Sequence, residues 1–156
     1  RLAPDLAATA ARGLGPRSDV PALLGAADAL VLTSDSEGCP NVVLEALAAG
    51  TPVVAADVGD IRDMVAPGET GFVVPAGDPD RYVEALCEVI ARRDSFAARV
   101  AARRQALAER WGVPAMVERT IALWAELARP GAAPPAEPRD AVTPPDPTPL
   151  RPTRSP

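Results

Sequence analysis

The sequence contains no lysine and no histidine, and all 16 of its basic residues are arginines. This absence excludes a histidine general base, a Schiff-base or P-loop lysine, and a histidine-ligated metal site. Its cysteines, Cys39 and Cys87, lie far apart in a chain with no secretory signal and no apolar run of about 18 residues. We therefore expect free thiols in a reducing, cytoplasmic protein.

Aromatic residues are also scarce, at 3% of the chain against an apolar share of 47%. A core built mainly from alanine, valine and leucine favours helices packed closely against a parallel sheet. The chain carries a net charge of −5 and lacks the clustered positive charge with which proteins bind the phosphate backbone of nucleic acids. We accordingly expect no nucleic-acid partner.

A chain of 156 residues is long enough for one domain with a real core, but too short for two lobes of ordinary size. Residues 130–156 carry 10 of the 19 prolines. Such a stretch can neither pair its backbone nor bury a core. We predict a domain over residues 1–129 and a proline-rich, disordered tail over 130–156.

Helical and strand patterns alternate in the first part of the chain. They predict a helix over 18–27, a strand over 29–33, a helix over 41–49 and a strand over 52–55. Ser18 or Asp19 would begin the first helix, Asn41 would cap the second, and Gly50 would end it in a left-handed conformation. This order is a βαβ unit, so we predict an α/β fold with a Rossmann-like parallel sheet flanked by helices.

Weaker patterns surround this unit. A strand over 9–14 is the least supported element, because Arg12 and Gly13 interrupt it. Further along, we expect a short helix over 61–65, a turn over 67–71, a strand over 72–74 and helices from 80 to 127.

The loop over 34–40 follows a predicted strand, and ligands of open parallel sheets bind outside the carboxyl ends of the strands. The next helix begins near Asn41, and its unpaired N–H groups and dipole suit an anion such as a diphosphate. Glu45 lies one turn further on the same helical face, where its carboxylate suits the adjacent hydroxyls of a ribose. Glu37, in the loop, would reach the same cleft and take sugar hydroxyls.

A plainer interpretation exists for both acids. Glu45 suits a solvated helix position, and Glu37 suits an ordinary surface loop. The spacing Glu-x7-Glu alone matches many sequences by chance. The sequence that flanks the two glutamates distinguishes between these interpretations.

The flanking sequence reads SEGCPNVVLEA over residues 36–46 and GTPVVA over residues 50–55. It resembles the signature of the GT4-type retaining glycosyltransferases. Flanking matches include GPRSDV over 15–20, VGD over 58–60 and GETGFVV over 68–74. The resemblance covers about residues 11–124.

This resemblance implies a partial C-terminal lobe of the GT-B fold that binds a UDP- or GDP-sugar for retaining transfer, without a metal ion or other cofactor. Carried over by motif, Glu37 is the catalytic residue that contacts the donor sugar, and Glu45 binds the nucleotide ribose. The remaining donor-binding positions are the backbone of Gly38, Asn41, Val42 and Val43, and, beside the base, Leu14 and Arg17.

The resemblance also implies a partner, the N-terminal lobe that holds the acceptor, and a chain that is inactive alone. Members of the family carry an Arg and a Lys that neutralise the donor diphosphate, and this lysine-free chain lacks that pair. Two alternatives stay open: a non-catalytic nucleotide or nucleotide-sugar binding module, and a GT-B relative such as a sugar-nucleotide epimerase.

Four arginines fall near one another on a helical wheel: Arg92, Arg99, Arg103 and Arg110. They form either a solvated face or a peripheral contact with anionic lipid. The apolar stripe beside them is modest, which favours the solvated face.

Overall fold

A computed structural model describes residues 11–129 of the chain. The predicted tail over 130–156 lies outside these residues, as do the first two residues of the strand predicted over 9–14. Residues 11–14 form no strand, so that prediction is wrong where it can be compared. Gly13, Gly15 and Pro16 lie in or directly after this stretch, and their conformational preferences oppose regular pairing.

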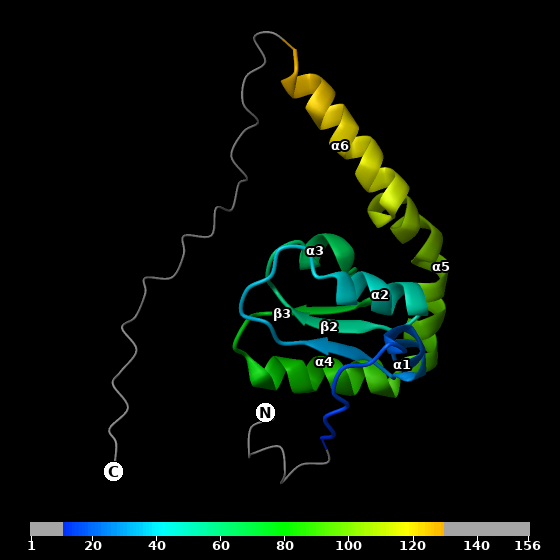
Figure 1. The fold of residues 1–156 in the computed structure, drawn as a ribbon. Helices are drawn as coiled ribbons and strands as arrows, with labels where there is room; N and C mark the ends of the chain where they lie inside the picture. The colour runs from blue at the N-terminus through cyan, green and yellow to red at the C-terminus, as the bar shows by residue number, and fades with distance from the viewer. Residues whose placement is uncertain (1–10, 130–156) are drawn as a thin grey trace, which may run out of the picture. The chain divides into compact units, whose positions relative to one another are not determined.

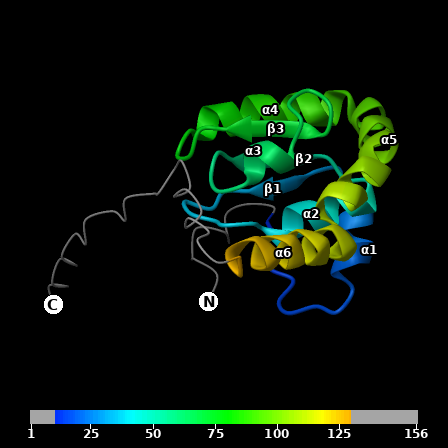
Figure 2. The same ribbon diagram turned by 90° about the horizontal axis from the view of Figure 1, so that it is seen from above.

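Three short strands form the sheet: β1 (Leu30–Leu32), β2 (Val53–Ala56) and β3 (Gly71–Val74). They are parallel and lie in the order β1, β2, β3, as Figure 2 shows. Leu30 pairs with Val53, and Val53 pairs with Gly71. The prediction of an α/β fold with a parallel sheet flanked by helices is confirmed.

The described residues also form the helices α1 (Val20–Ala26), α2 (Asn41–Ala49), α3 (Ile61–Met64), α4 (Pro79–Ala91), α5 (Arg93–Trp111) and α6 (Val113–Leu127). The chain divides into two compact units between Val117 and Glu118, and the division falls within α6. No residue of α6 is buried, and its large apolar side chains, among them Ile121 and Trp124, are exposed. Within residues 11–129, no helix is both long and apolar enough to cross a membrane.

The first unit has three layers, because β2 is buried on both faces. Figure 1 shows α2 and α3 above the sheet and α4 below it. Successive strand residues point to opposite faces. Val53 and Ala55 accordingly pack toward α2 and α3, whereas Val54 and Ala56 pack toward α4.

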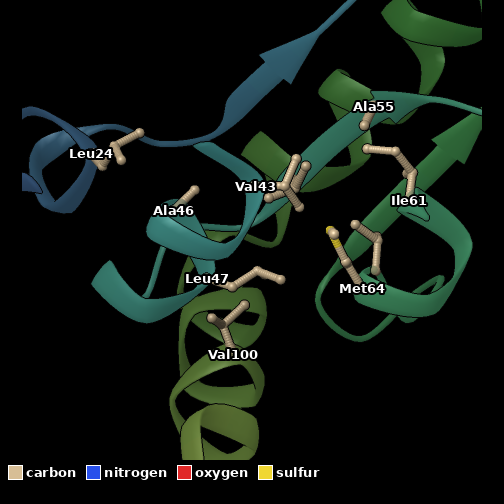
Figure 3. Close-up of a cluster of buried hydrophobic side chains, with 10 residues drawn as sticks. Leu24, Val43, Ala46, Leu47, Ala55, Ile61, Met64 and Val100 are labelled. Carbon is tan, nitrogen blue, oxygen red and sulfur yellow. The ribbon is translucent and has the colours of Figure 1, made fainter. Parts of the chain in front are cut away.

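A valine- and leucine-rich cluster fills the upper layer. Its buried members in Figure 3 include Val43 and Leu47 from α2, Met64 from α3 and Val100 from α5. Full burial of one such side chain contributes about 1.5–3 kcal/mol. These contacts, rather than helix propensity, hold α2 against the sheet and fix where its first turn lies.

Helix α2 has the predicted bounds, but its N-cap differs from the prediction. Pro40 occupies the N-cap position with φ −72° and ψ 105°, no side chain caps the helix, and Asn41 is the first helical residue. The prediction that Asn41 caps α2 is therefore wrong. Gly50 ends the helix at φ 93°, a left-handed conformation that glycine adopts without steric cost, as predicted.

Helix α1 begins two residues later than predicted. Asp19 occupies its N-cap position, but the Asp19 side chain makes no capping hydrogen bond. Its carboxylate instead binds the guanidinium of Arg17. The ion pair outside the helix competes for the same oxygens that a cap would use.

The four arginines of the predicted face all contact the chain itself. Their partners are the Glu88 carboxylate for Arg92, the Gly68 carbonyl oxygen for Arg99, Glu69 for Arg103 and Asp63 for Arg110. Three of these contacts join α5 to α3 or to the turn that follows it. Each of the four arginines thus has a partner within the chain while its side chain stays partly exposed, and the choice between a solvated face and a lipid contact stays a prediction.

Candidate functional site

The loop over residues 34–40 and the turn over 57–60 lie at the same end of the sheet, because they follow the parallel strands β1 and β2. The backbone amide of Asp60 donates a hydrogen bond of 2.9 Å to the carbonyl oxygen of Gly38. This bond ties the loop after β1 to the turn after β2.

Gly59 lets the two segments approach closely. Its φ is 53°, and a Cβ atom there would lie 2.2 Å from the Gly38 carbonyl oxygen and 2.4 Å from that of Glu37. Distances below about 3.0 Å do not occur for real Cβ atoms, so only glycine fits. The backbone of Glu37 is therefore held against the turn.

The start of the loop is held from the other face of the sheet. The Tyr82 hydroxyl, from α4, donates a hydrogen bond of 3.0 Å to the carbonyl oxygen of Leu32, the last residue of β1. Burial and, to a lesser extent, the negative charge of Asp35 raise the pKa of Tyr82 above its ordinary value. The phenol thus keeps its proton and stays a donor.

Glu37 is half-buried in this loop, and one of its oxygens is occupied. The Ser34 hydroxyl donates a hydrogen bond of 2.7 Å to Glu37 Oε1. A hydrogen bond to a carboxylate is stronger than one between neutral groups. The side chain of Glu37 is consequently oriented as well as its backbone.

Glu45 differs from Glu37 in its surroundings. It is exposed on α2, and its side chain makes no hydrogen bond or ion pair with any residue from 11 to 129. Because helical side chains lean toward the helix N-terminus, we expect the Glu45 carboxylate to lie toward the first turn of α2. It is free to accept two donors from a ligand.

The first turn of α2 presents backbone amides beside these acids. The amides of Asn41 and Val42 have no acceptor within the described part of the chain, whereas the Val43 amide donates to the Pro40 carbonyl oxygen at 3.1 Å. The Val43 side chain is buried in the core. Glu37, Gly38, Asn41, Val42 and Glu45 all belong to the loop after β1 or to the start of α2, at the carboxyl end of the sheet.

Leu14 and Arg17 are not joined to this surface. Leu14 is 51% exposed, and Arg17 binds Asp19 through two hydrogen bonds of 2.7 and 2.5 Å. The ion pair raises the pKa of Arg17 and lowers the pKa of Asp19. Within residues 11–129, neither Leu14 nor Arg17 hydrogen-bonds to the loop.

Sequence reasoning missed three residues that shape the site: Ser34, Asp60 and Tyr82. Ser34 carried a local signal, since it lies three residues before Glu37 at the start of the loop. Tyr82 carried none, because 50 residues separate it from Leu32 in the sequence. The Asp60 contact is made by a backbone amide, which any residue other than proline could supply.

Two hollows of the first unit are lined by residues other than the two acids. One of about 380 Å³ lies between β3 and α4 and is lined by Phe72, Arg81 and Glu84. Another of about 250 Å³ lies between α3 and α5 and is lined by Arg62 and Arg103. Neither is lined by Glu37 or Glu45.

A parallel α/β unit with a polar loop and a helix N-terminus at its strand ends is the arrangement of Rossmann-like nucleotide-binding domains. The model of the family "Glycosyl transferases group 1" matches residues 3–92. The chain belongs to this family.

Two curated relatives illustrate the similarity. The D-inositol 3-phosphate glycosyltransferase of Geodermatophilus obscurus is 45% identical over 96 residues, which cover 62% of this chain and 20% of the relative. The GDP-mannose-dependent alpha-mannosyltransferase of Mycobacterium tuberculosis is 38% identical over 87 residues, which cover 55% and 22%. The chain therefore spans about a fifth of the length of the curated relatives it matches.

Solved structures give the same class. Anabaena Alr3699/HepE in complex with UDP-glucose superposes with a TM-score of 0.63 at 25% identity, covering 70% of this chain and 30% of the other. Sucrose-phosphate synthase from Thermosynechococcus elongatus superposes with a TM-score of 0.55 at 31% identity, covering 66% and 27%. The fold is that of a Rossmann-like unit of a GT-B glycosyltransferase.

Proposed function

We propose that the chain is the donor-binding part of a retaining, GT4-type glycosyltransferase with the Glu-x7-Glu signature. One observation carries the proposal. Glu37 lies in the loop that leads into α2 and Glu45 lies one turn into that helix, at the strand ends where Rossmann-like units bind nucleotides, in a chain of this family.

Glu45 is assigned to the ribose. A carboxylate has two acceptor oxygens, which match the two adjacent hydroxyls of the sugar. Glu45 has no partner within residues 11–129, so a ribose need not displace an existing hydrogen bond. Each bond to the charged group contributes about 1.5–3 kcal/mol.

The diphosphate is assigned to the start of α2. The open amides of Asn41 and Val42 can donate to phosphate oxygens, with the Val43 backbone beside them. The helix dipole contributes about 0.3–1 kcal/mol at an exposed end. This is modest for a doubly charged group, so other cations of the full enzyme are expected to assist.

Glu37 is assigned to the donor sugar, with the Gly38 backbone as a second contact. Leu14 and Arg17 are assigned to the rim of the base pocket. Arg17 would have to share or leave the Asp19 carboxylate to reach a ligand. Retention of configuration without a metal ion is part of the same proposal.

The relatives support a nucleotide-sugar donor but suggest two nucleotides. The mannosyltransferase is named as GDP-mannose-dependent, and the Anabaena protein is complexed with UDP-glucose. Both donors share the diphosphate and ribose that the site would contact. The acceptor, in this proposal, binds to parts of the enzyme outside the donor site.

Calorimetric titration of the chain with UDP, GDP, UDP-glucose and GDP-mannose tests the proposal. We expect one nucleotide pair to bind and Glu45→Gln to weaken both of its members. Binding of neither pair would overturn the proposal.

A second experiment separates an enzyme from a binding module. The matched segment of the Geodermatophilus relative is replaced by the corresponding segment of this chain, and transfer by the chimera is measured. Transfer that Glu37→Ala abolishes supports the enzyme. Donor binding without transfer supports the module.

A further inference from the structure

We infer that Ser34 is a positioning residue, which holds the Glu37 carboxylate in the orientation that contacts the donor sugar. This inference rests on the proposed function of Glu37. Its basis is the hydrogen bond of 2.7 Å from the Ser34 hydroxyl to Glu37 Oε1. Both side chains are half-buried, so water competes less for this bond than at a fully exposed site.

The backbone beneath Glu37 is already immobilised by three contacts. The Tyr82 hydroxyl donates a hydrogen bond to the Leu32 carbonyl oxygen, and the Asp60 amide donates one to the Gly38 carbonyl oxygen. Gly59 lies directly against the Glu37 backbone. What remains free is the glutamate side chain itself. A long side chain such as glutamate loses up to about 1.5–2 kcal/mol of rotamer entropy when it is ordered.

Ser34 removes that freedom before a ligand arrives. The hydrogen bond restrains Oε1, and it leaves Oε2 and the second lone pair of Oε1 to accept sugar hydroxyls. A carboxylate fixed in advance avoids the ordering cost on binding. The benefit should therefore appear only for a ligand that carries the sugar.

Two other roles for Ser34 make different predictions. If the bond only stabilises the loop, its loss weakens the nucleoside diphosphate and the nucleotide sugar equally. If the hydroxyl itself contacts the sugar, its loss weakens the nucleotide sugar even in a variant without the Glu37 carboxylate. A double-mutant cycle with Glu37 separates these cases.

The experiment measures the dissociation constants of UDP and UDP-glucose, and of GDP and GDP-mannose, by calorimetry. The proteins are the wild-type chain, Ser34→Ala, Ser34→Thr, Glu37→Ala and the double variant Ser34→Ala/Glu37→Ala. Ser36→Ala is the matched control, because Ser36 is an exposed serine of the same loop with no hydrogen bond within residues 11–129. Thermal unfolding of each variant checks the fold.

We expect Ser34→Ala to weaken the nucleotide sugar by roughly 5- to 10-fold, the size of one hydrogen bond, and to leave the diphosphate within about twofold. Ser34→Thr keeps the hydroxyl and should restore most of the loss, and Ser36→Ala should change neither ligand. In the Glu37→Ala background, Ser34→Ala should have no further effect.

The inference would be overturned if Ser34→Ala lowered the affinity for the nucleoside diphosphate and for the nucleotide sugar equally. It would also be overturned if Ser34→Ala weakened the nucleotide sugar as much in the Glu37→Ala background as in the wild type. If the wild type binds none of the four ligands, the proposed function fails as well. If the wild type binds a nucleotide sugar and Ser34→Ala binds it equally well, the positioning role of Ser34 is excluded and the proposed function stands.

Discussion

Gly59 lies so close to Glu37 that a Cβ atom on the glycine would be 2.4 Å from the glutamate's carbonyl oxygen. The backbone of the turn after β2 therefore packs directly against the backbone of the loop after β1. Glu37 gains its place in the site from a residue that carries no functional group of its own.

Gly59→Ala is expected to destabilise the first unit by about 2–5 kcal/mol. A left-handed backbone at a non-glycine residue costs about 1–2 kcal/mol, and displacing the loop adds about 1–3 kcal/mol. Gly77→Ala is the matched control, because Gly77 has φ 77° with nothing within 4 Å of a Cβ atom. Chemical denaturation measures both variants. Equal losses of unfolding free energy in the two variants would show that the close contact of Gly59 with the loop adds nothing to the cost of the substitution.

Tyr82 is expected to titrate above its ordinary value, because burial raises its pKa and Asp35 adds to the effect. It is the only tyrosine of the chain, so the ultraviolet absorbance of tyrosinate reports it alone. Since the folded-state pKa is raised, its contribution to stability is full below the unfolded value of about 10 and is lost as pH rises through the folded value. Asp35→Asn should reduce the shift without abolishing it.

Tyr82→Phe tests the tether to Leu32. Loss of its hydroxyl removes a hydrogen bond of 3.0 Å and should lower the free energy of unfolding by about 0.5–1.5 kcal/mol. The variant should also lose the alkaline decline in stability, since it has no phenol to ionise. A decline equal to that of the wild type would assign the effect to other groups.

Glu45→Gln is expected to keep the fold and weaken the preferred nucleoside diphosphate by about 1.5–3 kcal/mol, or roughly 10- to 150-fold in Kd. The fold should be unaffected, because the exposed carboxylate has no partner within residues 11–129. Glu84→Gln, at an exposed glutamate of α4, is the control for the change in net charge. Unchanged affinity in Glu45→Gln would exclude the ribose assignment.

The 156-residue chain by itself is expected not to transfer sugar at an appreciable rate. Enzymes lower barriers by about 8–23 kcal/mol, mostly through groups fixed around the developing charge. One helix N-terminus provides about 0.3–1 kcal/mol, and the chain has no lysine to place at the leaving diphosphate. The measurement is nucleotide release from UDP- and GDP-sugars, with and without acceptors. Acceptor-dependent release that Glu37→Ala abolishes would contradict the expectation.

Features that depend on neighbours in the chain were predictable from the sequence. The bounds of α2, the left-handed Gly50 that ends it and the parallel βαβ order all follow from local periodicity and from the preferences of single residues. The cap of α2 was not predictable in this way. The loop places Pro40 at the N-cap and Asn41 inside the helix, and the residues just before Pro40 lie against the turn at Gly59.

The sequence by itself therefore determined the fold class and selected the two glutamates as candidates, because repeating apolar spacing and a short motif are both local properties. Only the tertiary structure decided how Glu37 is held. The bonds from Asp60 to Gly38 and from Tyr82 to Leu32 join residues that no local pattern relates. They form because packing of β2 and α4 brings a backbone amide and a tyrosine hydroxyl within hydrogen-bonding distance of carbonyl oxygens far away in the sequence.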